Sequence, residues 1–367
     1  MEFRTVLTKA EQAEAVELSK SIFKDNMGEQ FTLLFSESNW KHMFIAIDKA
    51  QIVSLVNYYP TFIKIGPSIV KAASVGSVCT KKEYRGQKLA SNLLKLAEQK
   101  MNEESIDLVI ISGAGGLYAD FGASLAGNVY EYYLDKTQFP VNENLNITLY
   151  NNYFFNILAD IQNQENVRYI RNSEEFNQLL TSQTFPDTFA NYPIYLIEDK
   201  NKPVAYIVGY LPTEGNEFGI KEFAGNRDAI VQSLRLLANR HHRDMIHFAA
   251  DIHDSINQIL SGLNRKVIHQ HASFKILDFV NIMDKLKPYF DSVYPNNGIK
   301  YGFINNKATF IHDDEIYTVD SSHQLSQILL GFDQPLNLKL ETSPSIKVFF
   351  DKVFPIPFVW TNNLNYQ

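Results

Sequence analysis

Two different spacings of apolar residues follow one another along the first part of the chain. Alternating or continuous apolar runs predict strands, whereas apolar residues three and four positions apart predict helices. Up to about residue 145 these patterns predict the order β-α-β-β-β-α-β-α-β. The predicted strands lie at 2–8, in a hairpin at 42–66, and at 68–80, 106–113 and 128–139. The helix after Thr80 carries one apolar stripe, made by Leu89, Leu93, Leu96 and Ala97.

The same order of hairpin, strand, helix and strand returns after a polar stretch near residues 141–146. Its elements are predicted at 192–211, 218–224, 226–242 and 245–251. A third block begins near His271, with an amphipathic helix at 274–290, alternating strands at 298–319, and helices at 321–332 and from 345 to Pro355. The order predicts an internal structural repeat. We therefore expect three domains, at 1–145, 146–270 and 271–367.

Composition narrows the classes of function. The 367 residues carry a formal net charge of -7 without a long run of either sign, which argues against a nucleic-acid binder and favours cationic partners. The single cysteine, Cys79, excludes an intramolecular disulfide and the usual multi-cysteine zinc sites. The N-terminus lacks the apolar core of a signal peptide, and no stretch approaches the roughly 18 apolar residues of a membrane span. We expect a cytoplasmic protein without a membrane or nucleic-acid partner.

A basic turn joins a predicted strand to a predicted helix in the stretch YRGQKLASNLL, residues 84–94. A helix N-terminus leaves about four N–H groups unpaired and carries partial positive charge, so it favours an anion such as phosphate. Gly86 lets the backbone approach a ligand, and Arg85 and Lys88 add charge. The alternative is a solvated basic loop before an ordinary helix. The glycine patterns of a Walker loop and of a Rossmann fingerprint are both absent.

This stretch resembles motif A of the GNAT superfamily of acyl-CoA-dependent N-acetyltransferases. That motif runs V-x-T, a spacer, then R/Q-x-x-G-x-G/A at the start of a helix. Here Val78-Cys79-Thr80 precedes Arg85, Lys88 and Ala90, and Lys88 stands where the family usually has its middle glycine. The segment GLYADFGA, residues 116–123, resembles the F/L-Y-x-x-F/L-G-F segment of many members, with Ala123 in place of the last aromatic residue.

The order of the domains resembles that of the Eis-type acetyltransferases (enhanced intracellular survival). In that family a GNAT unit is followed by a degenerate second unit and a sterol-carrier-like domain. The resemblance implies an α/β (α+β) fold, with tandem GNAT units followed by an α+β domain, and a homo-oligomer. It also implies acetyl-CoA as the acyl donor, with no metal.

The resemblance implies roles for individual residues. The backbone from Gly86 to Ser91 would hold the pyrophosphate of acetyl-CoA, and its pantetheine arm would pair with Val78–Thr80. An N–H near Cys79 would polarise the thioester carbonyl. The implied cofactor-binding residues are Val78, Cys79, Thr80, Arg85, Gly86, Gln87, Lys88, Leu89, Ala90, Ser91, Ser112 and Gly113.

Tyr118 and Gln367 are the predicted catalytic residues. A phenol with a pKa of about 10 is a suitable proton donor to a thiolate whose thiol has a pKa of about 8.5. The alternative for Tyr118 is a core position, since the chain has 19 tyrosines. In the Eis-type family the terminal carboxylate, here that of Gln367, helps to deprotonate the amine; the alternative is a frayed terminus. The amine attacks directly, so we expect Cys79 to be buried rather than nucleophilic.

Other polar groups are expected to have structural roles or to mark the acceptor. His241, His242, His247 and His253 match no standard zinc spacing. Asp228, in the first turn of the second unit's helix, would repel phosphate, so we expect that unit to bind no CoA. The acceptor candidates are Asp25, Glu29, Phe35 and Trp40, whose alternative is a surface segment packed on the core.

Two functions from different classes follow. The first is an acetyl-CoA-dependent N-acetyltransferase, whose acceptor is a primary amine of a cationic small molecule or of a lysine side chain. The second is a catalytically silent protein of the same fold that senses CoA or binds an apolar ligand.

Overall fold

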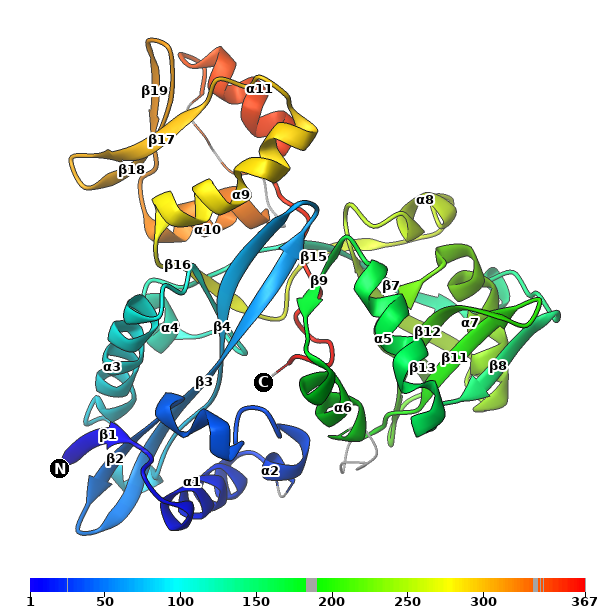
Figure 1. Ribbon diagram of the computed structural model, residues 1–367, viewed down its shortest axis with the longest axis horizontal. Helices are drawn as coiled ribbons and strands as arrows, with labels where there is room; N and C mark the ends of the chain where they lie inside the picture. The colour runs from blue at the N-terminus through cyan, green and yellow to red at the C-terminus, as the bar shows by residue number, and fades with distance from the viewer. Residues whose placement is uncertain (25, 183–189, 333–335, 337, 339, 367) are drawn as a thin grey trace. The chain divides into compact units, whose positions relative to one another are not determined.

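The computed structural model of the chain describes residues 1–24, 26–182, 190–332, 336, 338 and 340–366. These residues form two compact units (Figure 1). Unit 1 contains Met1–Gly127, His271–Ile356 and Tyr366, and unit 2 contains Asn128–Gln270 and Pro357–Asn365. Each unit is therefore assembled from segments that are far apart in the sequence.

The sheet of unit 1 has the strand order β1-β2-β3-β4-β5-β16-β6. Its strands are β1 (Glu2–Thr5), β2 (Met43–Asp48), β3 (Gln51–Ile65), β4 (Ser68–Thr80), β5 (Leu108–Ile111), β16 (Ser273–Ile276) and β6 (Ser124–Leu125). Neighbours along this order are antiparallel, except that β4 and β5 are parallel. The helix α3 (Leu89–Glu103) connects β4 to β5 and buries Leu93 and Ala97 against the sheet, as the sequence predicts.

The other face of this sheet is covered by the N-terminal helices α1 (Lys9–Ile22) and α2 (Met27–Gln30). Thr8 begins α1, and its side chain accepts a hydrogen bond from the N–H of Glu11 at 3.2 Å. Leu18 and Met27 pack there with Cys79 of β4. The core of unit 1 therefore lies on both faces of the sheet.

The sheet of unit 2 has the strand order β15-β7-β14-β13-β12-β11-β8. Its strands are β15 (Lys266–His269), β7 (Asn128–Asp135), β14 (Met245–Asp251), β13 (Glu217–Gly225), β12 (Lys202–Pro212), β11 (Ile194–Asp199) and β8 (Leu145–Leu149), and β10 (Ala190–Asn191) also pairs with β12. The remaining elements of this unit are α5 (Phe155–Gln164), β9 (Val167–Ile170), α6 (Ser173–Ser182), α7 (Arg227–Arg240) and α8 (Ile256–Ile259). The parallel pair β13 and β14 is joined by α7, as β4 and β5 are joined by α3. The predicted repeat is thus confirmed.

Two strands of the structure, β7 and β16, differ from what the sequence predicts. The strand expected to close the first unit is β7, and it pairs with β14 and β15 in the sheet of unit 2. The start of the helix predicted at 274–290 is instead β16, which pairs with β5 and β6 in unit 1. For β7, the reason is that alternation identifies a strand but not its partner. For β16, the reason is that the helix begins only after Asp278, whose side chain caps it by accepting a hydrogen bond from the N–H of Asn281 at 3.0 Å.

The C-terminal part of unit 1 combines helices with a small antiparallel sheet. Its elements are α9 (Phe279–Val293), β17 (Lys300–Ile304), β18 (Lys307–His312), β19 (Glu315–Thr318), α10 (Ser322–Leu330) and α11 (Pro344–Val353). Aromatic side chains fill its core, among them Phe310 and Phe350, whose ring centroids lie 4.9 Å apart. The α+β content agrees with the prediction, while the sterol-carrier likeness and the three-domain boundaries stay predictions.

Candidate active site

The turn that precedes α3 adopts an unusual backbone conformation. Gly86 has φ 80°, and Lys88, which directly precedes the helix, has φ 59° and ψ 23°. The Lys88 side chain does not cap the helix, and the first helical hydrogen bond runs from the N–H of Asn92 to the carbonyl of Lys88 at 3.0 Å. The N–H groups from Leu89 to Ser91 therefore point out of the helix end, as in an anion site.

The charges around this helix end are positive. Arg85, Gln87 and Lys88 are exposed, and the Nε of Arg85 donates to the carbonyl of Thr80 at 3.2 Å. The first turn of α3 contains no acidic side chain. Both the helix dipole and the side chains thus favour an anion. The positive φ of Lys88 also explains why glycine suits this position.

The strands β4 and β5 separate next to this helix end. Their last paired residues are Val75 and Ile111, and the N–H and Oγ of Ser112 both donate to the carbonyl of Val75, at 3.1 and 3.2 Å. Beyond this point β4 continues along β3 alone to Thr80. One edge of β4 from Gly76 to Thr80 therefore lacks β5 as a partner.

A β-bulge interrupts β4 in the same stretch. Cys79 pairs with Leu55 and Gly76 with Asn57, so Ser77 and Val78 together oppose one residue of β3. Ser77 has φ 53°, and its Oγ lies 2.7 Å from that of Ser19 on α1. The N–H of Lys81 donates to the carbonyl of Val53 on β3. Along an antiparallel strand the N–H groups point alternately toward and away from the partner strand, so the N–H of Cys79, two residues earlier, also points toward β3. The bulge, rather than Cys79, is where the backbone departs from regular pairing.

Tyr118 lies at the far side of the strand separation, on the short helix α4 (Gly116–Asp120). A side chain at Gly113 would bring its Cβ to 3.3 Å from Cε2 of Tyr118, so only glycine fits comfortably beside this ring. Burial raises the pKa of Tyr118, and Tyr366 and Cys79 add to the rise. Among the described residues no hydrogen bond engages the Tyr118 hydroxyl. The phenol is thus protonated and available.

Tyr366, near the end of the chain, belongs to the same site. Its ring centroid lies 6.4 Å from that of Phe31, and its hydroxyl interacts with the side chain of Ser112. Burial raises the pKa of Tyr366. Sequence reasoning missed this residue, because only the fold brings residue 366 beside residues 112 and 118.

The remaining predicted residues have different outcomes. Cys79 is buried, as predicted, and burial raises the pKa of its thiol to about 12. Phe35 is buried in the core next to α1, whereas Glu29 is exposed and Trp40 half-buried. Asp25 and Gln367 lie outside the described residues.

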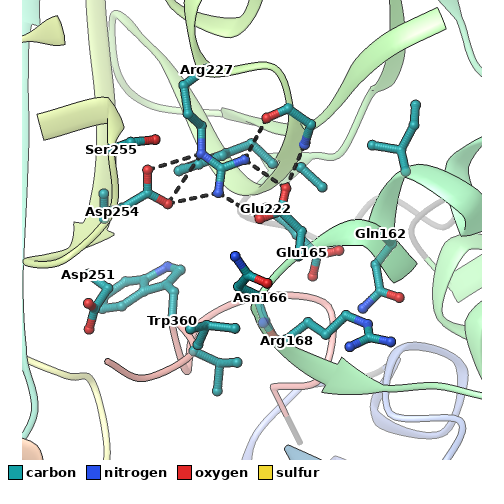
Figure 2. Close-up of a pocket in the computed structure, with 18 of the residues that line it drawn as sticks. Gln162, Glu165, Asn166, Arg168, Glu222, Arg227, Asp251, Asp254, Ser255 and Trp360 are labelled. Carbon is teal, nitrogen blue, oxygen red and sulfur yellow. Dashed lines mark hydrogen bonds and ion pairs between the residues drawn. The ribbon is translucent and has the colours of Figure 1, made fainter. Parts of the chain in front are cut away.

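Unit 2 has a pocket where its own parallel strands separate (Figure 2). The pocket has a volume of about 1010 Å³ and is lined by the ends of β13 and β14, the start of α7 and the tail residues Pro357–Trp360. Arg227 at the start of α7 is held by Glu165 at 2.7 Å and by Asp254 at 2.9 Å. The side chain of Asn226 already caps this helix by accepting from the N–H of Ala229. The N-terminus of α7 is therefore capped and paired, unlike that of α3. That unit 2 binds no CoA stays a prediction.

His241 and His247 of unit 2 form side-chain hydrogen bonds. Nε2 of His247 lies 3.1 Å from a carboxylate oxygen of Glu131, and His241 contacts the hydroxyl of Tyr195 at 2.5 Å. Over the described part of the chain, no group of three or more metal-ligating side chains is found. Within the same residues no helix is both long and apolar enough to cross a membrane.

Comparison with known proteins identifies the domain in the first third of the chain. Residues 4–126 match the model of the acetyltransferase (GNAT) domain, so this part of the chain is a GNAT acetyltransferase domain. A comparison with curated proteins found no match.

The whole chain shares its fold with solved structures. A GCN5-related N-acetyltransferase from Anabaena variabilis is 15% identical with a TM-score of 0.66, and the match covers 98% of this chain and 100% of that one. A probable N-acyltransferase from Enterococcus faecalis is 13% identical with a TM-score of 0.69, over 98% and 97% of the two chains. Eis1 from Mycobacterium abscessus is 11% identical with a TM-score of 0.60, over 90% of each chain. The Eis-like architecture predicted from the sequence is thereby confirmed.

Proposed function

We propose that the protein transfers an acetyl group from acetyl-CoA to a primary amine of a cationic small molecule or of a lysine side chain. The observation that carries the proposal is one arrangement within unit 1. Three groups lie around the point where β4 and β5 separate: the uncapped N-terminus of α3, the free edge of β4 and the phenol of Tyr118. Acetyl-CoA would supply a reactive thioester there. The net charge of -7 favours a cationic acceptor.

The residues of this arrangement fit the parts of acetyl-CoA. The N–H groups of Leu89–Ser91, with Arg85 and Lys88, would hold the pyrophosphate. The free edge of β4 near Thr80 would pair with the amides of the pantetheine arm, flanked by Ser112 and Gly113. We assign the N–H that polarises the thioester carbonyl to the bulge at Ser77–Val78, because that of Cys79 turns toward β3.

Tyr118 would protonate the departing thiolate after direct attack by the amine in a ternary complex. Because burial raises its pKa above the ordinary value of 10.0, the phenol remains protonated across the neutral range. Loss of the acid form would lower activity only on the strongly alkaline side. The group proposed to take the amine proton, from the resemblance to the Eis-type family, is Gln367, which lies outside the described residues.

The cofactor site is tested by calorimetric titration with acetyl-CoA. The double variant Arg85→Glu, Lys88→Glu is expected to bind about 100-fold more weakly, because two cations beside a diphosphate become anions. The matched control is Lys95→Glu, which reverses an exposed charge in the middle of α3 and should leave the affinity within about twofold. Equal losses in both variants would contradict the proposed pyrophosphate site.

Catalysis is tested by thiol release with a panel of amines. Tyr118→Phe keeps the ring in its place and is expected to lower kcat by about 100- to 1000-fold while leaving the affinity for acetyl-CoA unchanged. A variant with unchanged kcat would remove Tyr118 from the mechanism. A folded wild type that binds acetyl-CoA but acetylates no amine would favour a CoA-sensing role instead.

A further inference from the structure

The pocket of unit 2 contains a half-buried carboxylate, that of Asp251, for which the described residues provide no cationic partner. Oδ1 of Asp251 accepts the N–H of His253 at 2.9 Å, and Oδ2 accepts the N–H of Phe358 at 3.1 Å. Within the described residues, Asp251 takes part in no ion pair. Two neutral donors leave further lone pairs of the carboxylate without a partner. A carboxylate that is taken out of water without a counter-ion tends to bind a proton or a cation.

The charges around Asp251 do not supply that cation. The guanidinium of Arg227, which also lines the pocket, is shared between Glu165 and Asp254, so it is already neutralised. Removal from water is the main cause that raises the pKa of Asp251, and the carboxylate of Asp254 adds to the rise, which brings the pKa to about 7. Besides Asp251, the titratable and charged side chains that line the pocket are Glu165, Arg168, Tyr169, Arg171, Tyr206, Lys221, Glu222, Arg227, Asp228, His253 and Asp254.

Arg168 and Trp360 lie on different sides of the pocket. Figure 2 shows Asp251 and the indole of Trp360 on one side, and Arg168 with Gln162 on the opposite side. Arg171, also in the lining, is bound by Glu222 through two hydrogen bonds of 2.8 and 2.7 Å. An indole face beside a carboxylate is a favourable setting for an organic ammonium ion, through cation–π attraction and a charged hydrogen bond.

We propose that this pocket is a second ligand site, separate from the acetyltransferase site, for a small organic ammonium ion that pairs with Asp251 and contacts Trp360. The volume of about 1010 Å³ accommodates a ligand of several carbon atoms. Apolar side chains such as Phe358 and Ile220 in the lining favour an amine with an apolar body. The site does not depend on the proposed acetyl transfer, because every residue in it belongs to unit 2.

The tryptophan content of the chain permits a direct test. The chain has 2 tryptophans, Trp40 and Trp360. The Nε1 of Trp40 is buried without a hydrogen-bond partner among the described residues, so Trp40→Phe removes no hydrogen bond. In the full-length W40F protein, fluorescence reports on Trp360 alone. The probe is 2-phenylethylamine, and its neutral isostere 2-phenylethanol is the matched control ligand.

The amine is expected to bind at least about tenfold more tightly than the alcohol at pH 8, because only the amine is charged. Asp251→Asn in the W40F protein should reduce the affinity for the amine to that for the alcohol. Asp228→Asn, which removes an exposed acid at the same pocket, is the matched control and should change the affinity by less than about twofold. Equal effects of the two substitutions, or equal affinities of amine and alcohol, would overturn the proposal.

The pH dependence keeps the proposal testable if Asp251→Asn does not fold. The raised pKa means that Asp251 is ionised above about pH 7 and protonated below it. The amine stays protonated up to about pH 10, so its affinity should fall about tenfold from pH 8 to pH 6 while that of the alcohol stays constant. An affinity for the amine that does not change with pH over this range would overturn the site. Binding measured without acetyl-CoA keeps this outcome independent of the outcome for acetyl transfer.

Discussion

At the scale of single residues, Lys88 combines two opposing effects. Its ammonium group adds positive charge at the end of α3, but its φ of 59° lies in the region that favours glycine. A residue other than glycine in this conformation costs about 1 kcal/mol. The position therefore gives up some stability of the fold in return for a charge beside the anion site.

Lys88→Gly is expected to separate the two effects. The free energy of unfolding, measured by urea denaturation, should rise by up to about 1 kcal/mol because the strain is relieved. The affinity for acetyl-CoA should fall by about tenfold because one cation is lost. Lys88→Ala is the control, since it loses the charge and keeps the strain, so its stability should not rise. If Lys88→Gly were the less stable of the two, the strain would not limit this turn.

At the scale of elements, α4 is held by segments from the other end of the chain. Nζ of Lys275 on β16 donates to the carbonyl of Phe121 at 2.7 Å and lies 4.0 Å from the centroid of its ring. Ser322 Oγ, at the start of α10, donates to the carbonyl of Gly122 at 3.2 Å, and His323 contacts that of Ala119 at 3.2 Å. These contacts satisfy the carbonyl end of a helix of only 5 residues. The position of Tyr118 thus depends on them.

Lys275→Met keeps an aliphatic chain over Phe121 and removes the charged hydrogen bond. We expect the free energy of unfolding to fall by about 1–3 kcal/mol, as for a lost hydrogen bond to a charged group. Steady-state kinetics should show kcat lowered by about tenfold, because Tyr118 is less well placed, and KM for acetyl-CoA almost unchanged. Glu98→Gln is the control, because it removes the ion pair with Lys275 but leaves the carbonyl contact. An increase in KM alone would argue against a role in positioning Tyr118.

At the scale of the whole molecule, the family domain at residues 4–126 does not contain its complete sheet. All residues of β5 from Leu108 to Ile111 are buried, and their antiparallel partner is β16, which begins 162 residues after β5 ends, at Ser273. Phe274 of β16 is fully buried, at 0% exposure. Without β16, the edge of β5 would expose apolar side chains and unpaired backbone groups.

A fragment of residues 4–126 alone is therefore expected to aggregate or to lack a cooperative thermal transition. Size-exclusion chromatography and circular dichroism would measure this, with the full chain as the control. Adding residues 271–356 as a second, co-expressed fragment supplies β16, α9 and α10 and should restore soluble material. A fragment 4–126 that is monomeric and unfolds cooperatively would show that β16 is dispensable.

The sequence by itself determined the order of elements, the class of fold and the turn at Arg85–Ser91. Each of these depends on residues that are close in the chain, whose spacing and composition are visible without a structure. Tertiary structure alone decided that β7 lies in the sheet of unit 2 and that residues 273–276 form the strand β16 rather than the start of a helix. It also decided that Tyr366 lies beside Tyr118 and that Asp251 is half-buried without an ion pair among the described residues. The physical reason is that pairing partners and burial depend on contacts between distant segments, for which local periodicity carries no signal.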